Sequence, residues 1–111
     1  MSKFLAMYLI PNAVLDDWMK TDPETRKAQE QKMGADWMAW ATAHKNLVTS
    51  TEAAGKTKRV TANGIADARN ELMLYSIVEA DSQEAAAKAF ETHPHLQIPQ
   101  ASIEVMPVRP M

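Results

Sequence analysis

Short apolar runs separated by polar turns predict four β-strands in this chain. Phe4–Ile10 is apolar and ends at a Pro-Asn pair, as expected of a strand covered on both faces. Residues 56–62 are rich in Thr and Val and lead into Asn63-Gly64, a strong turn signal. Residues 69–80 carry aromatic and branched side chains and suit a third strand antiparallel to the second. Residues 101–108 alternate as a fourth strand, and their prolines favour an edge position.

Two longer amphipathic stretches predict the main helices. The first begins at Asp22, a possible N-cap, with Pro23 at the first helical position, and extends to about Val48. Its apolar stripe has spacings of four, three and four residues and comprises Met33, Trp37, Trp40 and His44. Gly34 beside this stripe suggests a close approach of another segment or a slight kink.

A second main helix is expected over residues 82–93, with a short helix near the N-terminus. Asp81 or Ser82 serves as the N-cap of the former, and Pro94 disfavours helical geometry at His93, so this helix should stop there. Residues 12–20 could form a brief helix with Val14, Leu15 and Trp18 along one side.

The element order is strand, helix, strand, strand, helix, strand, which predicts an α+β, ferredoxin-like βαββαβ fold with a four-stranded antiparallel sheet. Two helices cover only one face of such a sheet. The other face should keep apolar side chains, for which Ile103 with Val105, or Leu72 with Leu74, are the candidates. Pairing of two such faces buries them, so a homodimer is expected.

Composition narrows the functional classes. A length of 111 residues fits one domain, residues 1–111. The net charge of -2 offers no broad basic field, so neither nucleic acid nor an anionic membrane is an expected partner. Without cysteine there is no disulfide, thiolate nucleophile or sulfur-based zinc site. The first apolar run is too short to span a bilayer, and a cytoplasmic protein is expected.

The runs NGIADARNELMLYSIVEADSQEAAAKAF and HPHLQIPQASIEVMPV resemble the YCII-related, DGPF-type family of dimeric α/β barrel proteins. The shared features are the turn, the following strand, the acidic-capped helix, the His-Pro break and the terminal strand. This chain reads NGIAD where many relatives have a DGPF run. The resemblance implies a ferredoxin-like protomer, a homodimer and a cleft between sheet and helices, with a histidine and an acid as suggested reactive groups.

His93 and His95 are the first candidates for chemistry. His93 follows the apolar stripe of its helix to the helix end, where the free carbonyls favour a protonated ring and burial favours a neutral one. These opposed effects could hold its pKa near neutrality, as a proton carrier requires. The alternative is a histidine that merely caps the helix. His95 either enters the same cleft as a substrate-binding group or lies on the surface.

An acid and a basic partner complete the catalytic hypothesis. Asp67 or Glu104 would orient His93, and Arg69 would bind an anionic substrate. The alternatives are solvent-facing carboxylates and a strand edge protected from aggregation by basic residues.

The tryptophans Trp37 and Trp40 either wall a pocket for an apolar ligand or belong to the core. The His-Pro-His spacing supplies two imidazoles but no assured third ligand, so no metal site is predicted. Dinucleotide-binding, phosphate-loop, nucleophile-elbow and zinc-protease motifs are all missing, and no cofactor is expected.

Two functions follow from these residues. The first is cofactor-free acid/base chemistry on a small organic molecule, with His93 as the proton carrier. The second is a non-catalytic module that binds a small ligand or another protein.

Overall fold

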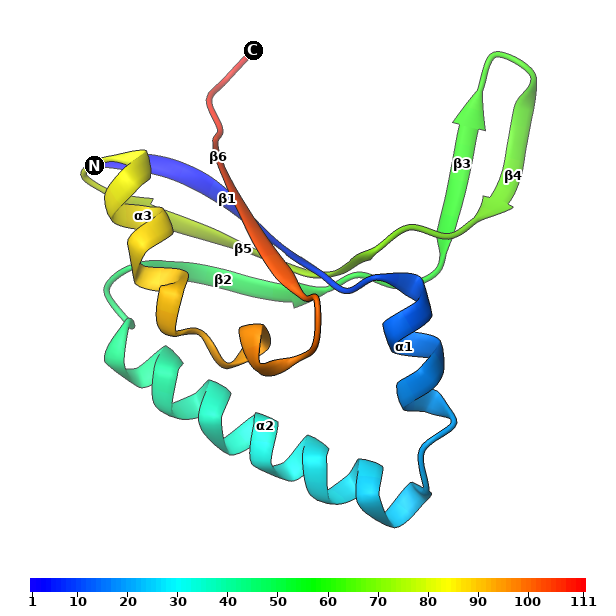
Figure 1. Ribbon diagram of the computed structural model, residues 1–111. Helices are drawn as coiled ribbons and strands as arrows, with labels where there is room; N and C mark the ends of the chain where they lie inside the picture. Colours follow the sequence, from blue (N-terminus) through cyan, green and yellow to red (C-terminus); the bar gives the residue numbers. More distant parts are fainter.

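The computed structural model describes residues 1–111 and contains a four-stranded antiparallel sheet with helices on one face (Figure 1). The strand order is β2-β5-β1-β6, which is the ferredoxin-like order, and the predicted α+β fold is confirmed. The strands of this sheet are β1 (Ser2–Leu9), β2 (Val48–Ala53), β5 (Leu72–Ala80) and β6 (Ser102–Pro107). The helical elements are α1 (Asn12–Met19), α2 (Pro23–Ala43), α3 (Gln83–Ala89) and the 3-10 turns η1 (Phe90–Thr92) and η2 (Pro94–Gln97). A separate hairpin is formed by β3 (Thr57–Thr61) and β4 (Gly64–Ala68).

Both main helices begin at the residues that the sequence predicts. The Asp22 carboxylate accepts a hydrogen bond from the Thr25 backbone N–H at 3.1 Å, and Pro23 is the first residue of α2. The Ser82 hydroxyl accepts from the Ala85 N–H at 3.0 Å. These side chains satisfy N–H groups that have no partner within the helix.

The second strand of the main sheet was wrongly placed by the sequence analysis. Residues 56–62 do form a strand, β3, but β3 pairs only with β4 across the turn before Gly64, whose φ is +124°. The sheet strand is β2, in a segment that was assigned partly to the long helix. It is mostly exposed, so it lacks the apolar periodicity that would reveal it. The predicted pairing of the second and third strands therefore occurs between β2 and β5.

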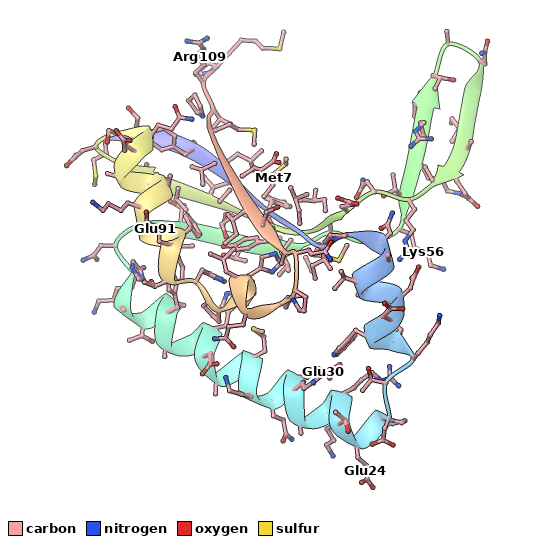
Figure 2. The ribbon with its side chains drawn as sticks, in the orientation of Figure 1. Met7, Glu24, Glu30, Lys56, Glu91 and Arg109 are labelled. Atoms are coloured by element: carbon pink, nitrogen blue, oxygen red, sulfur yellow. The ribbon has the colours of Figure 1, made fainter.

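Alternation along β1 sorts its side chains between the two faces of the sheet. Phe4, Ala6 and Tyr8 are buried beneath the helices. Leu5 and Met7 point to the opposite face, and Met7 is seen on the side away from α2 in Figure 2. No helix covers this second face, which is called the open face below.

The side chains of the open face differ from those expected. Ile103, Val105 and Leu74 pack against the core beneath the helices. The apolar members of the open face are instead Leu5, Met7, Tyr75, Ile77 and Met106, which are paired through β1. The predicted face is therefore wrong for Ile103, Val105 and Leu74, whereas Leu72 pairs with Leu9, which alternates with Leu5 and Met7.

None of the helices combines the length with the apolar character that crossing a bilayer requires.

The core contains a chain of hydroxyl groups. The Tyr8 hydroxyl lies 2.8 Å from the Ser76 Oγ, which lies 2.6 Å from the Thr51 Oγ1. Tyr8 and Ser76 are both fully buried, and the Tyr8 hydroxyl depends on Ser76 as its hydrogen-bond partner.

Ser76→Ala should lower the free energy of unfolding by about 1–3 kcal/mol, because it leaves the Tyr8 hydroxyl buried without a partner. Adding Tyr8→Phe should recover part of this loss. Urea unfolding of the single and double variants measures both effects, and a double variant less stable than Ser76→Ala would contradict this account.

Candidate functional site

His93 and His95 lie in the core, where they are 2% and 1% exposed. Pro94 between them ends the helical segment that began at α3 and opens the turn η2. The His93 Nδ1 accepts a hydrogen bond from the His95 backbone N–H at 3.0 Å, so the ring caps η2. This cap differs from the expected one, in which the ring would bind the last carbonyls of the preceding helix.

Aromatic rings surround His93. Its ring centroid lies 4.3 Å from that of Trp37, 4.4 Å from that of Trp40 and 5.1 Å from that of Tyr8. Because Nδ1 is an acceptor, the proton of the neutral ring resides on Nε2, and this buried Nε2 has no hydrogen-bond partner. The structure thus brings together four of the predicted site residues, His93, His95, Trp37 and Trp40.

Burial decides the protonation state of His93. Loss of solvent, with smaller contributions from the nearby His95 and His44, lowers its pKa to about 4. The expected pKa near neutrality is therefore wrong. The opposing effect of the helix end is weak, since α3 ends at Ala89 and the ring binds none of its carbonyls.

His95 is likewise held in the neutral form. Burial lowers its pKa, against hydrogen bonds to the backbone of Leu9 and Ser102 that raise it. Its Nε2 lies 3.0 Å from the Leu9 carbonyl oxygen, and so Nε2 carries the proton. At neutral pH both imidazoles are therefore uncharged, and neither acts as an imidazolium acid.

The predicted partners of His93 lie elsewhere. Asp67 is paired with Lys58 on the β3–β4 hairpin. Arg69 makes two hydrogen bonds to Asp16 of α1, at 2.7 and 3.2 Å, which lower the pKa of that carboxyl. Glu104 is exposed and pairs with Met7 in the sheet register, which places it on the open face. None of the three approaches the imidazole as an orienting acid or an anion-binding group would.

A cleft of about 1020 Å³ lies between α1, α2 and the segment 97–100. Trp37 lines this cleft and also contacts His93, so one indole separates the cleft from the buried imidazole. Trp40 belongs to the core and donates from Nε1 to the Ala89 carbonyl at 3.2 Å. The apolar part of the lining is Ile10, Val14, Leu15, Trp18, Met33, Trp37, Ile98 and Pro99.

Polar groups form the rim of the cleft. Trp18 donates to the Gln29 side chain at 2.8 Å and so ties α1 to α2. Lys32 binds Asp36 at 2.8 Å and Gln97 at 3.4 Å, which ties α2 to η2. The charged lining residues are Asp17, Glu30 and Lys32. Glu30 is seen on the side of α2 that faces the sheet, whereas Glu24 points away (Figure 2).

Two residues of the cleft wall have unusual local geometry. Gln100 has a φ of +61°, a left-handed conformation that is uncommon for a residue with a side chain. Gly34 also lines the cleft, and a Cβ placed there meets no atom within 4 Å. Gly34 therefore does not serve the close approach that its position in the sequence suggested.

Sequence reasoning did not identify α1 and residues 97–100 as walls of a site. The signal was partly present, because Val14, Leu15 and Trp18 were expected on one side of the short helix. No helical periodicity extends to residues 97–100, whose position depends on the tertiary fold.

Groups of three or more residues suited to holding a metal ion are not found in the structure. A shallower hollow of about 720 Å³ lies between α3 and β6 and is lined by Glu84, Phe90, Glu91 and Val105, among others. It touches neither buried histidine.

Comparison with known proteins places the fold. No family model matches the chain, and no match was found among the curated proteins. Among solved structures, the chain is similar to 5-chloro-2-hydroxyhydroquinone dehydrochlorinase, TftG, from Burkholderia phenoliruptrix AC1100, in complex with 2,5-dihydroxybenzoquinone. The TM-score is 0.51 and the sequence identity 12%, over 94% of this chain and 91% of that chain. The likeness shows the fold, in agreement with the ferredoxin-like protomer implied by the resemblance to the YCII-related family.

The buried His93 should make the protein sensitive to mild acid. Its pKa of about 4 in the folded state lies below the unfolded value of 6.5, so the unfolded chain binds more protons between these limits. Above pH 6.5 the ring is neutral in both states, and the folded protein keeps its full stability. As the pH falls from 6.5 toward 4, protonation of the unfolded chain lowers the free energy of unfolding. The free energy of unfolding should fall by up to about 1.4 kcal/mol per pH unit for this ring.

His93→Asn should flatten that dependence, because the amide oxygen retains the cap on η2 but does not titrate. Urea unfolding at pH 7 and pH 5 measures the change in stability between the two values. Ser82→Ala is the control, since loss of a cap should lower stability equally at both. An unaltered pH dependence in His93→Asn would contradict the assignment.

Proposed function

We propose that the protein binds a small, largely apolar organic molecule with a planar ring in the cleft between α1, α2 and residues 97–100. The observation that carries this proposal is the lining: the indoles of Trp18 and Trp37 lie in one cleft with aliphatic side chains, beneath a polar rim. Flat aromatic walls with few polar groups suit a ring compound, which stacks on the indoles while the rim orients its substituents.

The fold likeness supports this choice of ligand. TftG is a dehydrochlorinase of a chlorinated hydroxyhydroquinone, and its structure holds a dihydroxybenzoquinone. The fold of this chain is thus one that accommodates a small ring compound in another protein. Membership of the YCII-related family is part of the proposal and is supported by this fold together with the sequence resemblance.

Cofactor-free acid/base chemistry is also part of the proposal. His93 is its candidate base, because the low pKa keeps the ring unprotonated at neutral pH. Its one basic nitrogen, Nδ1, accepts the His95 backbone N–H, so this hydrogen bond would have to open before the ring could take a proton. Trp37 lies between this base and the cleft, so a substrate would reach it only if the indole turned aside. That shielding favours the second candidate, a non-catalytic binding module, which needs the same cleft but no access to His93.

A homodimer is proposed through the open face. Leu5, Met7, Ile77 and Met106 form its apolar centre, on the side of the sheet that no helix covers. Packing of two such sheets would remove this surface from water, and a two-fold arrangement is the usual way in which one patch is buried against itself.

Ligand binding should perturb two of the three tryptophans. In a ¹H–¹⁵N spectrum with 2,5-dihydroxybenzoquinone as the probe, the indole signals of Trp18 and Trp37 should shift. The Trp40 signal should shift much less, because its N–H is bound to Ala89 in the core. Equal shifts of all three signals, or none up to millimolar probe, would contradict binding in this cleft.

The matched variants for this test are Gly34→Leu and Gly34→Ala. A leucine side chain at this position would fill part of the cleft and should weaken binding at least tenfold, whereas alanine meets open space and should bind as the parent does. Alanine should also stabilise the helix by roughly 1 kcal/mol. The variant His93→Asn separates catalysis from binding alone. If the parent protein converts the probe and His93→Asn binds it without converting it, the protein is an enzyme that uses His93.

Leu5→Lys should abolish the dimer, because it places a charge at the centre of the buried face. Sedimentation equilibrium at micromolar concentration should give twice the chain mass of 12.4 kDa for the parent and the single mass for the variant. Met38→Lys, at a position of α2 that is 71% exposed, is the control and should remain dimeric. A parent protein that sediments as a monomer would refute the proposed interface.

A further inference from the structure

The β3–β4 hairpin, called the arm below, projects from the body of the protein (Figure 1). Its two strands pair only with each other, and all their residues except Thr57 and Ala68 are exposed. Val60 and Ile65 are direct partners in the register and so share one face of the arm, where they are 74% and 73% exposed. These are the most exposed branched apolar side chains in the protein.

The arm has little to stabilise it in isolation. A single two-stranded hairpin is marginally stable at best in water. Its ion pair between Lys58 and Asp67 is exposed, and exposed pairs contribute little. A surface that covers Val60 and Ile65 would supply the missing stabilisation.

The position of the arm indicates what that surface is. The arm rises on the side of the sheet opposite to α2, the side to which Met7 also points (Figures 1 and 2). Each strand of five residues spans about 17 Å, whereas two sheets packed face to face lie only about 10 Å apart. An arm of this length would extend past the sheet of a second copy seated on the open face.

Charge also favours a second copy. The arm, residues 57–68, holds two basic side chains and one acidic side chain, a net charge of +1, in a chain whose net charge is -2. The remainder of the chain therefore carries -3. The arm of one copy is attracted to the acidic body of another.

We propose that the arm is an interface element that embraces a second copy of this chain and buries Val60 and Ile65 against it. The inference rests on the homodimer proposed above and adds a second contact to it, outside the open face. Each dimer would contain two such contacts, related by the two-fold axis.

A fluorescent label tests the contact directly. The chain has no cysteine, so Ile65→Cys carries a single polarity-sensitive fluorophore. Its emission should be blue-shifted at concentrations where the protein is dimeric and should shift to the red on dilution, in step with the loss of dimer measured by sedimentation. The same label at Met38→Cys, on an exposed position of α2, should not respond.

Removal of the apolar pair tests its contribution. The double variant Val60→Ser/Ile65→Thr should raise the dimer dissociation constant at least tenfold, while Met38→Ser leaves it unchanged. Two results together would overturn the arm contact: a parent-like dissociation constant in the double variant, and label emission at position 65 that does not change on dilution. The proposed dimer through the open face would still hold in that case. A parent protein that is monomeric at every concentration would overturn both.

Discussion

The packing of helices against one face of the sheet is the constraint on which the other features depend. Alternating residues of β1 point to opposite faces, so Phe4, Ala6 and Tyr8 meet the helices while Leu5 and Met7 do not. Every apolar position on the second face must therefore be covered from outside the chain or remain in contact with water. The same division fixes the site, because His93, His95 and Trp37 pack around Tyr8, on the helix-covered face.

Trp37 joins the core to the cleft. On one side, its ring packs against the buried cluster of Tyr8, His93 and His95, at centroid distances of 5.2, 4.3 and 6.4 Å. It also lines the cleft between α1, α2 and residues 97–100. The position of this indole is thus set by tightly packed rings, whereas α1 across the cleft has no buried residue. The cleft has one wall fixed by the core and one held mainly by surface contacts.

The sequence was informative wherever a local signal decides the structure. Asp22, Ser82 and Pro94 act within one turn of their own positions, and the helix starts and the break before η2 follow from them. Strand β2 has only two partly buried residues, and its pairing with β5 is a long-range choice that leaves little trace in its own pattern. The site shows the same contrast. The location of His93 at a helix end is local, but its low pKa arises mainly from burial, and the rings that bury it include Trp37 and Trp40, more than fifty positions away.

The connection between β4 and β5 brings the two proposed surfaces together. Arg69 lies in this connection at the base of the arm, and its guanidinium binds the Asp16 carboxylate of α1 through two hydrogen bonds. A two-point contact of this kind fixes direction as well as distance. Since α1 is the less firmly held wall of the cleft, its position relative to the sheet is defined in part by the residue from which the arm departs. The cleft and the arm therefore share a structural support, although Val60 and Ile65 lie on a hairpin that takes no part in lining the cleft.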